Sequence, residues 1–189
     1  GDGVPDVVTA YTLTSTPAGG SPVATYRVKV FKGDSVGSFS EWAALDLPVY
    51  GVPADLDVGD LNFDGRVDIV VITLFRICVF LNNGGGSFTR LDSVIGPGNF
   101  GCQNLALTDF NGDDKLDLLI TRPSSVLFSP LGIDLFLGLG NGFFVAGPST
   151  LTSFKPSVVA MFDVNVDGLA DALVSSANAA PLVALVLNG

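Results

Sequence analysis

Three stretches of the chain carry oxygen donors at one fixed spacing. Residues 60–68, 109–117 and 163–171 each have Asp at positions 1, 5 and 9 and Asn at position 3, and an apolar run follows each stretch at once. Together with a backbone carbonyl at position 7, these groups make a compact ring of hard oxygen donors around one cation. The spacing therefore predicts calcium sites.

Other metals fit these loops less well. Magnesium requires a tighter octahedron, and zinc or copper favours the His and Cys ligands that the loops lack. An EF-hand needs Glu at position 12 between two helices, but Val71, Ile120 and Val174 stand there, inside apolar runs. Ordinary surface turns also collect Asp, Asn and Gly. Three full copies, each running straight into a strand-like segment, favour the metal site over that alternative.

A sharp turn is expected at position 6 of each loop. Gly65 and Gly168 stand there, and so does Gly3 in a partial copy, residues 2–6, that matches the last five positions of the others. Glycine adopts a positive φ without steric cost. The second full copy has Asp114 at this position, and Asp tolerates the left-handed region better than most residues.

The elements that position the loops are expected to be strands. Each loop is followed by an apolar strand, then by a strand that ends in a turn rich in Asn and Gly, which supply the positive φ of tight hairpins. An aromatic residue, at Phe39, Phe88 or Phe143, begins a third strand, and a fourth leads into the next loop. The expected ranges are 7–12, 67–74, 116–121 and 170–175; then 26–31, 77–81, 133–137 and 182–187; and, before the loops, 55–58, 104–108 and 158–162.

The spacing of the copies predicts the architecture. The last Asp of each loop falls at Asp6, Asp68, Asp117 and Asp171, which are 62, 49 and 54 residues apart, the size of a four-stranded propeller blade. We therefore expect an all-β, β-propeller-like array of about four blades with calcium-binding loops. It forms a single domain, 1–189, with repeats at about 1–54, 55–103, 104–157 and 158–189.

The first and last repeats are expected to be incomplete. An incomplete blade leaves an unpaired strand edge that invites a partner strand. This predicts that the array is part of a larger propeller or repeat assembly.

Composition narrows the class of protein. The hydrophobic content of 48% supports one ordinary globular domain. Twelve of the 18 Asp lie in the four loops, so most of the net charge of −10 comes from the predicted calcium ligands. Without a basic patch, nucleic acid is not an expected partner. No apolar stretch is long enough for a membrane span. The chain begins inside a motif and without Met, so we expect that an upstream segment was removed or left out.

The two cysteines leave two alternatives open. Cys78 and Cys102 are 24 residues apart within one repeat. In an oxidising compartment they would pair and cross-link that repeat, and otherwise they are two buried free thiols on strands.

Millimolar calcium is found outside cells, where weak loops of this kind bind it, so the protein is expected to be secreted or on the cell surface.

The loop motif and the turn after it resemble a known family. The pattern D-x-N-x-D-G-x-x-D before an apolar strand, followed by a turn such as residues 81–88, LNNGGGSF, is similar to the FG-GAP and VCBS repeats of integrin-type β-propellers. The resemblance covers nearly the whole chain. It implies a propeller stiffened by calcium and work outside the cell, as in integrin heads, propeller lectins, surface proteins and some polysaccharide lyases. The chain departs from the family in the number of blades, because integrin-type propellers usually close with seven and this chain has at most four.

The resemblance also implies a ligand set, in which the residue at position 7 contributes its backbone carbonyl. The implied calcium ligands are Asp60, Asn62, Asp64, Arg66 and Asp68; Asp109, Asn111, Asp113, Lys115 and Asp117; Asp163, Asn165, Asp167, Leu169 and Asp171; and, as half of a fourth site, Asp2, Val4 and Asp6.

Three functional classes differ in how well they fit the residues. The chain has no His, which removes the commonest general base. Of the carboxylates outside the loops, Asp55 and Asp57 lie on an expected strand and the others are scattered singly, so an enzyme is not expected. A structural or adhesive repeat module, assembling head-to-tail into an array or filament, fits the incomplete ends. The alternative is a propeller that binds a glycan or a protein, with Trp42, Tyr50 and Phe100 as candidate contacts unless they pack in the core.

Overall fold

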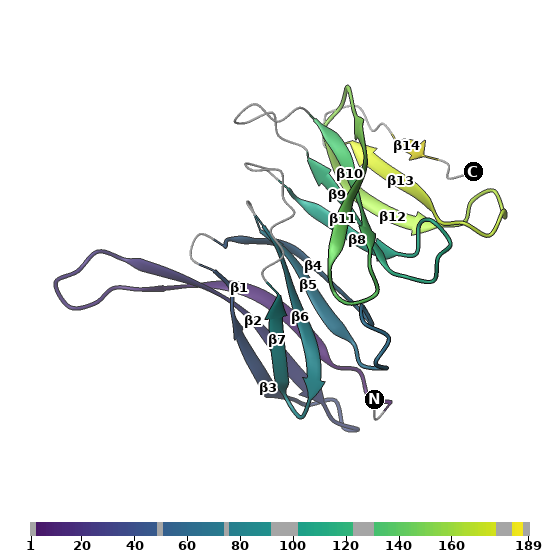
Figure 1. The fold of residues 1–189 in the computed structure, drawn as a ribbon. Coiled ribbons are helices and arrows are strands. Elements are labelled where there is room, and N and C mark those ends of the chain that lie inside the picture. The colour runs from purple at the N-terminus through teal and green to yellow at the C-terminus, as the bar shows by residue number, and fades with distance from the viewer. Residues whose placement is uncertain are drawn as a thin grey trace.

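The computed structural model is all-β and describes residues 3–48, 51–73, 76–91, 102–122, 131–176 and 183–186 (Figure 1). Its strands are β1 (Val7–Ser15), β2 (Val23–Gly33), β3 (Phe39–Asp46), β4 (Pro53–Gly59), β5 (Asp68–Thr73), β6 (Ile77–Gly84), β7 (Ser87–Leu91), β8 (Asn104–Thr108), β9 (Asp117–Arg122), β10 (Gly132–Gly138), β11 (Phe144–Leu151), β12 (Pro156–Phe162), β13 (Asp171–Ser176) and β14 (Val183–Val186). They fall on the segments that the sequence predicts. Among the described residues, no helix is long and apolar enough to cross a membrane.

The strands form four antiparallel sheets in chain order. The first sheet is β1-β2-β3, the second β4-β5-β6-β7, the third β8-β9-β10-β11 and the fourth β12-β13-β14. Every pair of neighbours in a sheet is consecutive in the chain, so each sheet is a meander built by hairpins. The strand that precedes a loop is an edge strand in the second, third and fourth sheets.

The core lies between the sheets. Along β5, Ile69 and Val71 pack with the first sheet, whereas Val70 and Ile72 pack with the third. Because successive side chains of a strand point to opposite faces, a strand between two sheets is apolar on both faces, as residues 69–72 of β5 are between Asp68 and Thr73. This is why β5 is buried along its whole length and appears in the sequence as a continuous apolar run.

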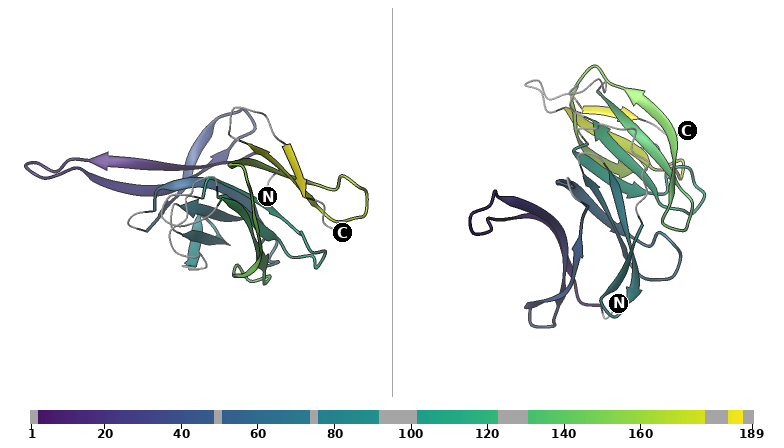
Figure 2. Two further views of the ribbon diagram at one scale, coloured as in Figure 1. Left: turned by 90° about the horizontal axis from the view of Figure 1, so that it is seen from above. Right: turned by 60° about the vertical axis from the view of Figure 1, so that its left-hand side comes forward.

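The first sheet carries an arm that the sequence does not predict. β1 and β2 pair in unbroken register from Val7↔Phe31 to Ser15↔Val23, several residues beyond the expected ends at Thr12 and Tyr26. The outer part of this hairpin extends away from the rest of the chain in all three ribbon views (Figures 1 and 2). Thr and Ser continue the alternation of β1 past Thr12, which extends the hairpin although little of the arm is buried.

The two cysteines do not form a disulfide. Both are buried as thiols, and they belong to different clusters: Cys78 packs between the first and second sheets, and Cys102 between the second and third. Burial raises the pKa of the Cys102 thiol to about 12. Of the two alternatives that the sequence leaves open, the structure has the buried free thiols.

Candidate metal-binding loops

The three full loops occupy the same place in three successive sheets. They connect β4 to β5, β8 to β9 and β12 to β13, and Figure 1 shows them along the same side of the molecule as the β2–β3, β6–β7 and β10–β11 turns. The Asp-rich segments therefore share one face, which we call the loop face. The β1–β2 arm extends from the opposite ends of its strands.

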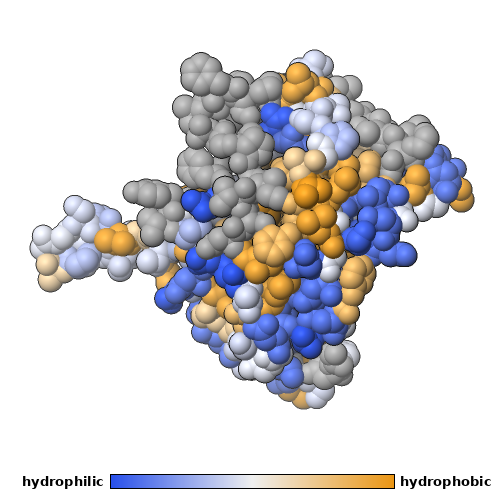
Figure 3. Space-filling view, viewed as in Figure 1, coloured by the Kyte–Doolittle hydropathy of each residue, from blue (hydrophilic) through white to orange (hydrophobic). Residues whose placement is uncertain are grey.

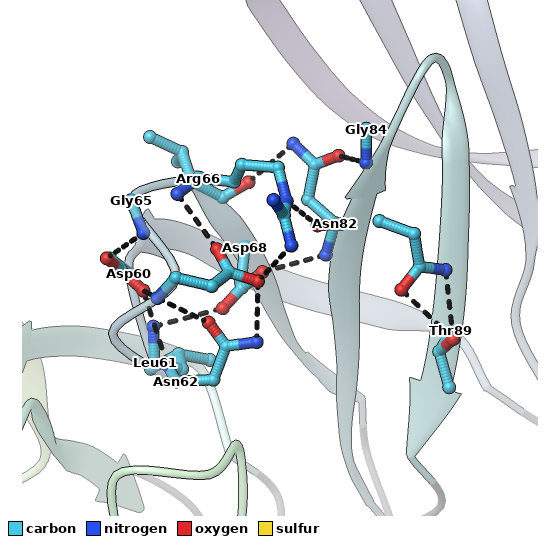
Figure 4. A network of polar contacts seen from close by, with 12 residues as sticks. Asp60, Leu61, Asn62, Gly65, Arg66, Asp68, Asn82, Gly84 and Thr89 are labelled. Atoms are coloured by element: carbon cyan, nitrogen blue, oxygen red, sulfur yellow. Dashed lines mark hydrogen bonds and ion pairs between the residues drawn. The ribbon is translucent and has the colours of Figure 1, made fainter.

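The ninth residue of each loop is a buried anchor. In the first full loop the side chain of Asp68 is fully buried, and it accepts hydrogen bonds from the N–H groups of Leu61, at 3.0 Å, and Asn82, at 2.7 Å (Figure 4). The first bond closes the loop, and the second ties the loop to the end of β6. A buried carboxylate needs such donors, because burial without them is costly.

The other copies repeat this anchor. The carboxylate of Asp117 accepts from Phe110 at 3.0 Å and Gly138 at 2.8 Å. Asp171 accepts from Val164 at 2.9 Å, and Asp6, in the partial copy, accepts from Gly33 at 3.0 Å. The scaffold is thus shared by all four copies as far as each is described; Asp2 lies outside the described residues.

In three of the four copies the anchor carboxylate accepts a backbone N–H from the end of the second strand after its loop. This donor was not identified from the sequence. At Gly33 and Gly138 an added Cβ would lie 2.1 and 2.2 Å from the carbonyl oxygen of the eighth loop residue, so the backbone approaches there as only glycine allows. In the first full copy Asn82 takes this place and donates from its side chain to the Val67 carbonyl at 3.1 Å. The Asn-Gly turns were the signal, but they were interpreted only as hairpin turns.

The first residue of each loop folds the chain around itself. Asp60 accepts from the N–H groups of Asp64 at 3.2 Å and Gly65 at 2.9 Å. The same pair of bonds reaches Asp109 from Asp113 and Asp114, and Asp163 from Asp167 and Gly168. The carboxylates at position 1 therefore point into the turn, as a ring of ligands requires.

The side chains at positions 3 and 5 also accept hydrogen bonds from the backbone of their own loops. The Asn62 side-chain oxygen accepts from the N–H of Asp64 at 3.2 Å, and the Asp64 carboxylate accepts from the N–H of Arg66 at 2.9 Å. Asn111 with Asp113 and Lys115, and Asn165 with Asp167 and Leu169, repeat both bonds. Every loop side chain that was predicted as a ligand in the three full copies thus accepts a backbone N–H within its own loop or sheet.

Two of the residues at position 7 also bring a charge. The Arg66 guanidinium lies 2.5 Å from Asp64, and the Lys115 ammonium lies 2.7 Å from Asp113. The sequence interpretation used only the carbonyls of these residues and missed their ion pairs. The hydrogen bond from Lys115 lowers the pKa of Asp113. Burial acts to raise the pKa of Asp64, but hydrogen bonds from Asn62 and Arg66 outweigh it and hold that pKa below its ordinary value.

The backbone of the loops has two left-handed positions, not one. Position 6 has a positive φ at Gly65 (77°), Asp114 (66°) and Gly168 (91°), as predicted. Position 4 has one as well, at Phe63 (60°), Gly112 (75°) and Val166 (62°). Each loop therefore has one glycine for two left-handed positions, and the second loop places it at position 4. Phe63 and Val166 are strained, since bulky and β-branched residues disfavour this region.

Burial and the negative charge of the loops raise the pKa of two anchor carboxylates, Asp68 and Asp117. Burial raises the pKa of Asp68, and the charges of Asp64 and Asp60 raise it further. Burial and the charge of Asp113 act in the same direction on the pKa of Asp117. In the first two full loops the neighbouring carboxylates thus oppose the negative charge of the anchor, which a bound cation would relieve.

The donors fit a hard cation by chemistry, although they are not gathered as a finished cage. Nowhere in the described part of the chain do three Asp, Glu, His or Cys side chains form a group that would hold a metal as they stand. The loop oxygens instead accept hydrogen bonds from the backbone N–H groups named above. Since a carboxylate oxygen has more than one lone pair, these bonds leave acceptor capacity for a cation of the calcium type.

A second set of acidic residues joins neighbouring sheets. The carboxylates of Asp55 and Asp57, on β4, accept hydrogen bonds from the backbone N–H groups of Leu105 and Leu107, on β8, both at 3.0 Å. The other oxygen of each accepts the N–H of the next residue on β4, at 2.9 and 2.8 Å. The sequence interpretation placed both Asp on a strand without a role, and the structure gives them one.

The loops themselves also touch from sheet to sheet. The N–H of Gly142, in the β10–β11 turn, donates to the carbonyl of Leu61 at 3.1 Å, and an added Cβ at Gly112 would lie 3.0 Å from the side chain of Leu169.

Of the candidate aromatic contacts, Trp42 is half-buried and packs edge-on against Phe88, with ring centroids 6.0 Å apart. Tyr50 and Phe100 lie outside the described residues.

Comparisons with known proteins agree with this geometry. A family model described as an FG-GAP-like repeat matches residues 1–71 and 76–120. The comparison with curated protein sequences gives no significant match. Among solved structures, a lectin of Agrocybe aegerita that recognises non-reducing terminal N-acetylglucosamine is similar, with 19% identity and a TM-score of 0.52. The match covers 95% of this chain and 52% of the lectin chain, so this chain spans about half of that structure. The likeness bears on the fold alone and supports a propeller-like arrangement.

Proposed function

Because this chain belongs to the FG-GAP-like repeat family, we propose that it is a calcium-stabilised extracellular repeat module with a structural or adhesive role. One observation carries the proposal: three loops with the same all-oxygen donors are held by the same hydrogen bonds in three successive sheets. In this account the ligands are those implied by the resemblance, from Asp60 to Asp68 and at the matching positions of the other loops.

A cation bound in these loops would act on the connections between strands and between neighbouring sheets. When bound, calcium would neutralise the carboxylates that now repel one another. Each loop links two strands of its own sheet, and Gly142 and Gly112 bring neighbouring loops into contact. Binding to the folded state alone stabilises that state by linkage. We therefore assign the loops a mechanical role, in which they fix the strands and their neighbours, and no catalytic one.

The proposed assembly is head-to-tail. The two three-stranded sheets, β1-β2-β3 and β12-β13-β14, stand at opposite ends of the series and have neighbours on one side only among the described residues. A contact between the two different ends of successive copies is heterologous and builds open arrays or filaments. Support for this reading comes from the order of the sheets, and native material observed as discrete monomers would contradict it.

A second candidate function is recognition of a glycan or a protein partner. The fold likeness to a lectin favours it. On the loop face, Phe63 and Phe143 are 59% and 42% exposed, and an added Cβ at Gly140, in the β10–β11 turn, would lie 2.8 Å from the Phe63 ring. Exposed aromatic rings near polar side chains offer apolar surface together with hydrogen-bonding groups. If this function holds, Phe63→Ala weakens binding on a glycan array, whereas Val36→Ala, on the β2–β3 turn, leaves it unchanged.

The primary proposal is tested by melting the protein in excess chelator, in millimolar calcium and in millimolar magnesium. Calcium should raise the melting temperature above that in chelator, and magnesium should raise it less, because its tighter octahedron fits these loops poorly. Equal melting curves under all three conditions would exclude the loops as occupied calcium sites.

A further inference from the structure

The seventh residue differs among the three full loops, whereas the predicted side-chain ligands are the same. Arg66 and Lys115 stand at this position in the first and second loops, and Leu169 stands there in the third. The backbone of each acts alike, since its N–H donates to the carboxylate at position 5, at 2.9, 3.0 and 2.8 Å. The side chain at position 7 therefore brings a positive charge to two loops and none to the third.

In the first loop the Arg66 guanidinium lies between the loop and the neighbouring hairpin. One of its nitrogens is 2.5 Å from Oδ2 of Asp64, and its Nε donates to the carbonyl of Asn82 at 2.6 Å (Figure 4). The same Asp64 oxygen also accepts from the side-chain amide of Asn62, at 2.9 Å. The guanidinium thus occupies an oxygen of a predicted calcium ligand.

In the second loop the Lys115 ammonium takes the corresponding place, 2.7 Å from Oδ2 of Asp113. The hydrogen bond to Asp113, and then the charges of Asp113, Asp117 and Asp109, raise the pKa of Lys115. Figure 3 shows a strongly hydrophilic patch, in blue, where this loop joins β8 to β9, and the Lys115 side chain is 35% exposed. An ion pair exposed to this extent separates at small cost in free energy.

The third loop lacks such a charge. Leu169 approaches the neighbouring loop instead, where an added Cβ at Gly112 would lie 3.0 Å from its side chain. Within the described part of the chain, no Lys or Arg pairs with Asp167, whose side-chain partner is the amide of Asn165 at 2.7 Å. The negative charge of this loop is therefore the least compensated of the three.

We propose that the Arg66 and Lys115 side chains are built-in counter-ions, which occupy the fifth-position carboxylate of the empty loop and leave it when calcium binds, so that the third loop binds calcium most tightly. The inference rests on the proposed function, because it concerns the same calcium ligands. A positive charge beside the site repels a dication and competes for its oxygens, and both effects weaken binding. The same charge stabilises the first two loops when no calcium is bound.

The test follows calcium binding to the whole chain separately at each loop, by NMR. The backbone N–H groups of Gly65, Asp114 and Gly168 donate to the first Asp of their own loops at 2.9, 2.8 and 2.9 Å. Their resonances therefore report on one site each. Calcium is titrated into the chelator-treated chain, and the melting temperature in excess chelator is measured in parallel.

The variants change the charge at position 7 and little else. Lys115→Met keeps the length of the side chain without its charge, and Lys115→Arg keeps the charge. Leu169→Lys adds a charge to the third loop, and Leu169→Met is its uncharged control. Lys155→Met controls for the overall charge, since Lys155 is exposed and stands next to the start of β12, at the end of that strand away from the third loop.

In the native chain we expect the Gly168 resonance to reach saturation at the lowest calcium concentration. Lys115→Met should tighten the second site about twofold to tenfold, and Leu169→Lys should weaken the third by a similar factor. Lys115→Arg, Leu169→Met and Lys155→Met should leave the affinities near those of the native chain. In chelator, Lys115→Met should melt about 1–3 °C below Lys155→Met, because the empty loop loses its counter-ion.

Two kinds of failure are distinguishable. If the native loops bind calcium but the third does not fill first, or if Lys115→Met leaves the second site unchanged, the counter-ion proposal is overturned while the calcium function stands. Equal melting of Lys115→Met and Lys155→Met in chelator would also overturn it. If no loop of the native chain responds to calcium, the proposed function and this inference both fail.

Discussion

The Asp57 carboxylate accepts a hydrogen bond from the backbone N–H of Leu107 at 3.0 Å, across the boundary between the second and third sheets. Both residues lie on edge strands, whose outward N–H groups have no ladder partner on that side. Asp55 and Leu105 repeat the contact two residues earlier. Here side-chain carboxylates accept hydrogen bonds from backbone N–H groups, as main-chain carbonyls do within a sheet. These bonds couple one repeat to the next.

Removing one of these carboxylates should expose one specific amide. For Asp57→Ala we expect faster hydrogen exchange at Leu107 with exchange at Leu105 unchanged, and a loss of about 1 kcal/mol in the free energy of unfolding. Asp55→Ala should show the reverse pattern. Exchange measured residue by residue decides the matter, and equal acceleration of both amides in either variant would contradict two independent bridges.

The anchor aspartates should matter even without metal. In Asp117→Asn one carboxylate oxygen becomes an NH₂ group, which cannot accept the N–H of Phe110 or Gly138. We expect the free energy of unfolding to fall by about 1–3 kcal/mol in excess chelator, as for other buried groups left without partners. Asp46→Asn, at an exposed position on β3, is the matched control and should have little effect. An anchor variant as stable as the control in chelator would mean that the hydrogen bonds contribute nothing.

The strained fourth position should respond to glycine with increased stability. Val166 has a φ of 62° and is 86% exposed, so its replacement removes strain and almost no packing. Val166→Gly is expected to stabilise the fold by about 1 kcal/mol, since a left-handed conformation costs that much for a residue with a Cβ. Val164→Gly, in the same loop but without a positive φ, should destabilise it by about 0.5–1 kcal/mol. Thermal unfolding of both variants tests the contrast, and the same sign in both would refute it.

A buried ion pair in the third sheet should be sensitive to losing one partner. Arg122 contacts Asp134 through two nitrogens, and the Ser149 hydroxyl donates to Asp134 at 2.6 Å. Arg122→Met should lower the free energy of unfolding by about 3–5 kcal/mol, because it leaves a buried carboxylate unpaired. The double variant Arg122→Met with Asp134→Leu should recover much of that loss. Urea unfolding measures both, and a double variant less stable than the single one would contradict the explanation.

Local features of this fold were predictable, and contacts between distant segments were not. The apolar runs and the Asp spacing place β5, β9 and the loops correctly, because both signals lie within a few consecutive residues. The bridges from Asp55 and Asp57 join residues 50 positions apart, and the donor to Asp68 lies 14 residues on, so nothing near these Asp in the sequence indicates them. The left-handed fourth position was hidden for another reason: two loops fill it with Phe63 and Val166, residues that propensity assigns elsewhere.

The most direct test of the central claim is the calcium content of the loops, measured by titration calorimetry on the native chain after chelation. The proposal predicts about three calcium ions per chain at millimolar calcium, one for each full loop. Asp64→Ala or Asp113→Ala should each remove one site and leave the others nearly intact, because repeats couple mainly to their neighbours. Asp46→Asn should keep the full number. Absence of calcium binding, or an unchanged number of sites in both loop variants, would contradict the claim that these loops are calcium sites.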